Sequence, residues 1–149
     1  MDNYNHMLTK FGENIEELLN DKSITEEQFA KSIQIDVSEV YRFIRKERLP
    51  LLSTVIKIAD CYNYSVDYLL GYKEFQEDAV YKKTPPFSEA FKKLLQNKNI
   101  TRYKISKKAN ISINRLDEWY NGKRMISLDN AIKLKKYFDI TLDELLGRI

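Results

Sequence analysis

The sequence predicts an all-α fold made of two consecutive five-helix domains. Three observations predict it: glycine and proline are scarce, the chain contains an internal repeat, and apolar residues recur at helical spacing. The 149 residues include only four glycines and three prolines, whereas all-β folds usually need more turn residues. A hydrophobic content of 43% with 32% charged residues is typical of a globular protein rather than a disordered one.

The repeat has a period of 76 residues and needs no gap, so that residues 11–71 align with residues 87–147. Identical pairs include Phe11/Phe87, Leu18/Leu94, Ile24/Ile100, Ile35/Ile111, Arg48/Arg124, Leu70/Leu146 and Gly71/Gly147. Matching apolar positions imply two copies of one fold. We therefore expect a first domain at residues 1–71, a linker at 72–84 and a second domain at 85–149. Cores of about 60 residues are marginal, so packing between the copies would help both.

The first three helices of copy 1 follow from periodicity and capping. Phe11, Ile15, Leu18 and Leu19 recur at helical spacing and define the first helix. A capping box formed by Thr25 and Gln28 opens the second helix. Asp36, together with Glu39, is expected to cap the third helix, which buries Val40 and Phe43.

The fourth helix follows Pro50, and we expect it to bury Val55, Ile56, Ala59 and Tyr62. Ser65 opens a short fifth helix, which Gly71 ends. Copy 2 repeats this order, with helix starts expected at Pro85-Pro86, Thr101, Ser112, Ser127 and Thr141. The linker carries aromatic residues among charges, so we expect it to pack against one or both domains, with a short helix as one form.

Three segments of each copy resemble the lambda-repressor-like (Cro/XRE-type) helix-turn-helix family. They are ITEEQFA at 24–30 with ITRYKIS at 100–106, IDVSEV at 35–40 with ISINRL at 111–116, and YSVDYLL at 64–70 with ITLDELL at 140–146. The resemblance covers about four fifths of the chain. The turn, where the family often has glycine, holds Gln34 and Asn110 here. The first motif helix, which the family often begins with glutamine, holds Glu26 and Arg102.

This resemblance implies a cytoplasmic, sequence-specific DNA-binding transcriptional regulator of bacterial or phage origin. Its partner would be double-stranded DNA, with the third helix of a domain entering the major groove and its first residues meeting base edges. The protein would either form a homodimer that reads two half-sites or use both copies of one chain as a pseudo-dimer. A second class is a protein-interaction module, antirepressor or antitoxin-like, that keeps the fold without specific DNA binding.

Charge favours copy 2 as the main DNA reader. Residues 11–71 carry seven Lys/Arg against eleven Asp/Glu, a balance of −4, whereas residues 87–147 carry thirteen against seven, a balance of +6. Duplex DNA is a dense polyanion, and affinity grows with each phosphate that is neutralised. The second copy therefore suits DNA better than the first.

The residues of copy 2 expected to contact DNA fall into two groups. Ser112, Ile113, Asn114 and Arg115 begin the recognition helix, where Asn can read adenine, Arg can read guanine and Ile can meet a thymine methyl group. Phosphate contacts are expected from Arg102, Lys123 and Arg124.

The first copy is expected to bind mainly protein. Its positions equivalent to the DNA-reading ones include Glu26, Asp36 and Glu39, whose carboxylates would face phosphates. A stripe on the third helix is instead apolar, and an exposed apolar stripe often marks an interface. The residues of this second interface, for protein or DNA, are Val37, Ser38, Tyr41, Arg42, Ile44 and Arg45. The alternative is that the linker covers the stripe.

Other function classes have little support in the sequence. The chain holds one cysteine, Cys61, and one histidine, His6, which argues against an intrachain disulfide and a metal site formed by these residue types. Because His6 lies near an end expected to be loose, a histidine-dependent catalytic triad is not expected either. No Gly-rich phosphate loop or catalytic carboxylate pair is visible, so we expect no enzyme, no cofactor and no small-molecule ligand. The first seven residues do not read as a signal peptide, and no apolar run is long enough to span a membrane.

Overall fold

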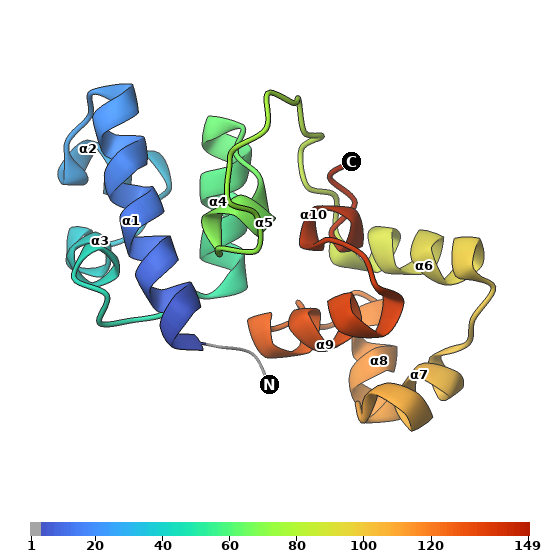
Figure 1. Ribbon diagram of the computed structural model, residues 1–149. Coiled ribbons are helices and arrows are strands. Elements are labelled where there is room, and N and C mark those ends of the chain that lie inside the picture. The colour runs from blue at the N-terminus through green and yellow to red at the C-terminus, as the bar shows by residue number, and fades with distance from the viewer. Residues whose placement is uncertain (1–3) are drawn as a thin grey trace. The chain divides into compact units, whose positions relative to one another are not determined.

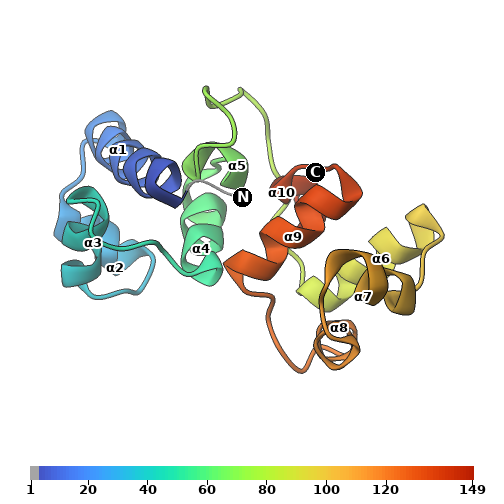
Figure 2. The same cartoon turned by 60° about the horizontal axis from the view of Figure 1, so that its bottom comes forward.

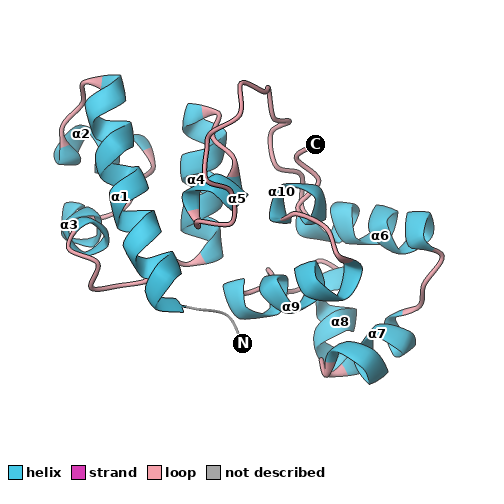
Figure 3. Cartoon of the chain, in the orientation of Figure 1, coloured by secondary structure: helices cyan, strands magenta, loops and turns pink. Residues whose placement is uncertain are grey.

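The computed structural model describes residues 4–149. Met1–Asn3, which begin the segment where no signal peptide is expected, lie outside the described residues. Within residues 4–149 the fold is all-helical, with ten helices and no strand (Figure 3). The chain divides into unit 1, Met1–Val80, and unit 2, Tyr81–Ile149. No helix in the described part of the chain combines the length and the apolar character needed to cross a bilayer.

The helices of the two units correspond in order (Figure 1). Unit 1 contains α1 (Tyr4–Lys22), α2 (Glu26–Ser32), α3 (Val37–Ile44), α4 (Leu52–Tyr62) and α5 (Val66–Leu69). Unit 2 contains α6 (Phe87–Lys98), α7 (Arg102–Ala109), α8 (Ile113–Tyr120), α9 (Leu128–Phe138) and α10 (Leu142–Leu145). The prediction of two five-helix copies is confirmed.

The first helix of unit 1 is longer than its counterpart in unit 2. It begins at Tyr4, so His6 lies within a helix, while the end expected to be loose falls on residues 1–3, outside the described residues. In unit 2, α6 begins at Phe87 because Pro86 precedes it, and a proline cannot supply an N–H group within a helix. The extra turns of α1 bury Met7.

Hydroxyl or carboxylate side chains cap most helices. The Thr25–Gln28 capping box is confirmed, with the Gln28 N–H 3.1 Å from the Thr25 hydroxyl and the Thr25 N–H 2.9 Å from the Gln28 side chain. Asp36 caps α3 by accepting from the Ser38 N–H at 2.9 Å. The Glu39 carboxylate, expected to share in this cap, pairs with Arg42 and Arg48 instead. The other capping side chains are Ser65, Thr101, Ser112, Ser127 and Thr141.

Each helix end is set by a residue in the left-handed region of backbone space. Within residues 4–149, the ten residues of positive φ form five pairs that are 76 positions apart: Ser23/Asn99, Gln34/Asn110, Lys46/Gly122, Asn63/Asp139 and Gly71/Gly147. Such a residue stops a helix because its backbone N–H bonds back to a carbonyl of the last turn. The turn positions where the family often has glycine thus keep the glycine-like backbone with Gln34 and Asn110.

The aromatic core is also repeated. Phe11 packs edge-on against Phe43 with ring centroids 5.1 Å apart, and the equivalent Phe87 packs edge-on against Trp119 at 6.2 Å. In each unit this pair joins the first helix to the third.

The fourth helix differs from the prediction in which side it buries. Val55 and Ala59 are buried as predicted, but Ile56 and Tyr62 are only half-buried. Ile58 and Leu52 complete the buried face instead. Within the unit, α4 packs on α5.

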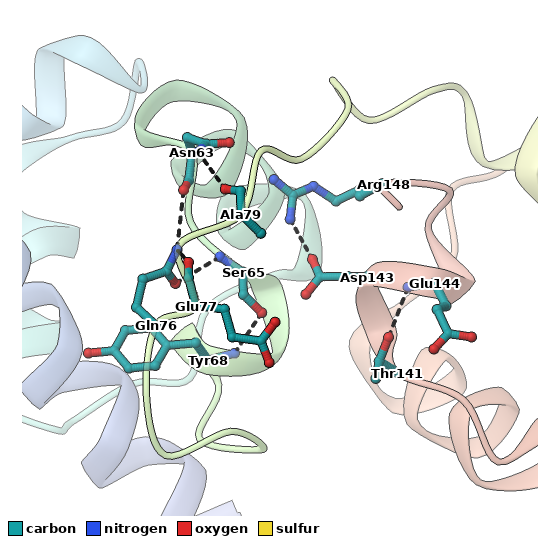
Figure 4. Close-up of polar contacts among 10 residues, drawn as sticks. All are labelled: Asn63, Ser65, Tyr68, Gln76, Glu77, Ala79, Thr141, Asp143, Glu144 and Arg148. Atoms are coloured by element: carbon teal, nitrogen blue, oxygen red, sulfur yellow. Dashed lines mark hydrogen bonds and ion pairs between the residues drawn. The ribbon is translucent and has the colours of Figure 1, made fainter.

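The linker forms no helix between residues 72 and 84, so that part of the expectation is wrong. Its first part is bonded to unit 1, where the Gln76 side chain accepts from the Ser65 N–H at 3.1 Å and donates to the Asn63 carbonyl at 3.3 Å (Figure 4). The Asn63 amide also donates to the Ala79 carbonyl. The last part of the linker belongs to unit 2, where the Lys82 N–H donates to the Arg148 carbonyl at 2.8 Å.

Candidate nucleic-acid interface

Helices α7 and α8 of unit 2 form the helix-turn-helix. The helix α8 packs against both α6 and α7, and Figure 2 shows α7 and α8 joined by a tight turn. Asn110, with φ of 55°, ends α7, and the buried Ile111 anchors the turn. The Ser112 hydroxyl then accepts from the Arg115 N–H at 3.2 Å and opens α8. The start of α8 is therefore fixed by a left-handed residue, a buried side chain and a capping hydrogen bond, all within six residues of sequence.

The two faces of α8 differ sharply in burial. Leu116 and Trp119 are buried, so they hold the helix to the unit. Ser112 and Asn114 are exposed, and Ile113 exposes 39% of its surface. The side chains predicted to meet base edges thus lie together at an accessible helix tip.

A single carboxylate links two of the predicted DNA-contacting arginines. Glu118 lies 3.7 Å from Arg115 and 3.3 Å from Arg124, measured from carboxylate oxygen to Nε. Its backbone carbonyl accepts from the Lys123 N–H at 2.8 Å, which ties the loop after α8 to the helix. All three basic side chains stay at least partly exposed. Sequence reasoning missed Glu118, although its position three residues after Arg115 signals an ion pair on a helix.

Arg102 is more engaged than the sequence indicates. Its guanidinium donates to Asp117 at 2.9 Å and lies over the Tyr120 ring, 3.9 Å from the centroid. These contacts fasten α7 to α8. A phosphate contact by Arg102 would have to compete with the Asp117 carboxylate.

The equivalent helix of unit 1, α3, presents a different surface. Val37, Tyr41 and Ile44 are half-buried rather than forming an open apolar stripe. The Tyr41 hydroxyl donates to Glu27 on α2 at 2.8 Å. This hydrogen bond lowers the pKa of Glu27 and raises the pKa of Tyr41. The linker's hydrogen bonds to unit 1 described above go to Asn63 and the α5 cap, not to this stripe.

Two arginines, one on α3 and one after it, form a cluster around Glu39. Its carboxylate oxygen lies 3.1 Å from Arg42 and 3.0 Å from Arg48. At the helix tip, the Ser38 backbone N–H lowers the pKa of Asp36, so this carboxylate is ionised at neutral pH. Ser38 is exposed, and Arg45 pairs with Glu47 at 2.8 Å. The tip of α3 is consequently acidic where the tip of α8 is not.

The comparisons with known proteins agree with this geometry. A helix-turn-helix family model matches the chain twice, at residues 15–69 and 91–145. No curated protein and no solved structure matches it significantly. The matched segments span more than half of the chain, and each includes part of the first helix and all of the second to fifth helices of its unit. The chain belongs to the Cro/C1-type helix-turn-helix family of DNA-binding regulators, with two tandem lambda-repressor-like copies.

Proposed function

We propose that the protein is a sequence-specific transcriptional regulator in which unit 2 is the main DNA reader and unit 1 mainly contacts protein. The observation that carries the proposal is the accessible tip of α8. There Asn114 and Ile113 are exposed beside Arg115, in a repeat whose charge balance is +6. Asn and Arg are the side chains that read adenine and guanine in the major groove.

The surroundings of that tip support the division of roles. Lys123 and Arg124 follow α8 and are exposed, at positions suited to phosphates. In unit 1 the tip carries Asp36 and Glu39, and the aligned repeat has a balance of −4. Carboxylates there repel the DNA backbone, which leaves protein contact as the better role.

The proposal is tested by titrating a library of genomic fragments with the protein at two salt concentrations. The wild type is expected to select a small set of fragments and to bind more weakly at high salt. Arg115→Ala is expected to lose about 1–3 kcal/mol of discrimination at one base position. Lys133→Ala is the matched control, since it removes one positive charge from an exposed site on α9. Feeble, equal binding to every fragment would overturn the proposal.

That last outcome would favour the second function class, a protein-interaction module that has kept the fold. The acidic tip of α3 is the observation in its favour. A second experiment tests whether unit 1 makes protein contacts, such as those of a homodimer. Tyr41 and Ile44 are replaced with serine, and the molar mass in solution is measured. A mass equal to that of the wild type argues against a dimer formed through α3.

A further inference from the structure

The two units contain the same three-residue charge cluster, but two of its members have exchanged places. Each cluster consists of an acid held between two arginines. In unit 1 Glu39 lies between Arg42 and Arg48, and in unit 2 Glu118 lies between Arg115 and Arg124. The 76-residue alignment places Glu39 on Arg115 and Arg42 on Glu118, while the third arginine is the same in both.

The two clusters have the same net charge and differ only in the order of their charges along the chain. Each has one negative and two positive groups, and the arginine after the helix exposes 53% of its side chain in both units. In unit 2 the arginine stands at the third residue of the helix and the acid one turn later. In unit 1 the acid stands at the third residue and the arginine one turn later. The two positions are three residues apart, so the swap moves a full charge by about 4.5 Å along the helix at the usual rise per residue.

We infer that the order of acid and arginine in this cluster decides which unit engages DNA. The inference rests on the proposed function. The first residues of the recognition helix lie closest to the groove, so a charge there meets phosphates and base edges before a charge one turn later does. Arg115 at this place attracts DNA, and Glu39 at the same place in unit 1 repels it. The acidic cap of α3, Asp36, where α8 has Ser112, acts in the same direction.

The exchange can be reversed without altering the net charge or the composition of the cluster. In unit 2 the variant is Arg115→Glu with Glu118→Arg. In unit 1 it is Glu39→Arg with Arg42→Glu. Both keep an ion pair at a spacing of three residues, so the fold is expected to hold, and far-UV circular dichroism through a thermal melt checks this.

Both variants are made in the full chain and titrated with duplex DNA at low and high salt. The unit 2 swap is expected to weaken binding about 10- to 100-fold although the net charge is unchanged. Adding the unit 1 swap to it is expected to restore salt-sensitive binding by roughly tenfold. The restored binding should not select the wild-type fragments, because Val37 and Ser38 stand where unit 2 has Ile113 and Asn114.

The results separate this inference from the proposed function. If the folded unit 2 swap binds like the wild type, or if the combined variant recovers nothing, the inference is overturned while the wild type's own selectivity still supports the proposed function. If the wild type binds no DNA at all, both are overturned. A loss with the unit 2 swap followed by the expected recovery supports the inference.

Discussion

The substitution Arg148→Ala is expected to destabilise unit 2, so that unit 2 unfolds at a lower urea concentration than unit 1. Arg148 and Asp143 form an ion pair in which the side chains expose only 1% and 0% of their surface (Figure 4). The Arg148 guanidinium also lies over the Tyr81 ring, 4.9 Å from the centroid. Its backbone carbonyl accepts from the Lys82 N–H at 2.8 Å. The alanine variant keeps this backbone bond and removes the buried cation.

The magnitude follows from the burial of the carboxylate that stays behind. Removing one member of a buried ion pair typically costs about 3–5 kcal/mol, because the remaining charge is desolvated without its counter-ion. Unit 2 spans residues 81–149, and a domain of that size is stable by about 3–10 kcal/mol at the usual value per residue. The substitution is therefore expected to consume a large part of the stability of unit 2.

The assay uses the single tryptophan of the chain as a reporter of unit 2. Trp119 is buried in that unit, and unit 1 has no tryptophan. Urea unfolding followed by tryptophan fluorescence should show a much lower midpoint for the variant, while far-UV circular dichroism should show a second, higher transition from unit 1. The double variant Asp143→Ala with Arg148→Ala should recover part of the lost stability. It removes the buried carboxylate that Arg148→Ala alone leaves without a counter-ion.

Two results would refute this reasoning. One is a fluorescence-detected loss below about 1 kcal/mol, which is the range of an exposed ion pair. The other is a double variant less stable than Arg148→Ala by the full cost of a second, independent substitution.

Three further predictions concern unit 1. Lys46→Gly should stabilise unit 1 by about 1 kcal/mol, because Lys46 has a φ of 61° at a position where unit 2 has a glycine. Urea unfolding followed by circular dichroism measures this gain, and an unchanged stability would show that the left-handed backbone costs nothing there. Leu51→Ser should add about 1 kcal/mol by capping α4, which has no side-chain cap although Ser127 caps the equivalent α9; an unchanged midpoint would contradict the capping argument. Burial raises the pKa of Tyr68 to about 12, with Glu17 contributing, so the neutral phenol is favoured in the folded state. Stability from this group is present below pH 10 and is lost as the pH rises toward 12. The variant Tyr68→Phe should abolish that part of the alkaline loss, measured as the free energy of unfolding against pH.

Local features of the fold were predictable because they depend on residues close in sequence. A cap such as Thr25 with Gln28 acts over three residues, and the 76-residue repeat placed each helix of one unit on its counterpart. The accessible tip of α8 followed from the same reasoning, since Leu116 and Trp119 occupy the opposite face. The helical start at Tyr4 was missed because it lies before Phe11, the first residue of the repeated apolar pattern.

The amino-acid sequence by itself determined the helices, the repeat, the charge difference between the copies and the side chains at the two helix tips. Only the tertiary structure decided what those side chains contact. In the folded protein Arg102 contacts Asp117 and Tyr120, and the apolar stripe of α3 is half-buried. Glu118 lies between two arginines that are nine residues apart in the chain. The physical reason is range: capping and helical periodicity act within one or two turns, whereas an ion pair or a covered face depends on how separate helices and loops pack together.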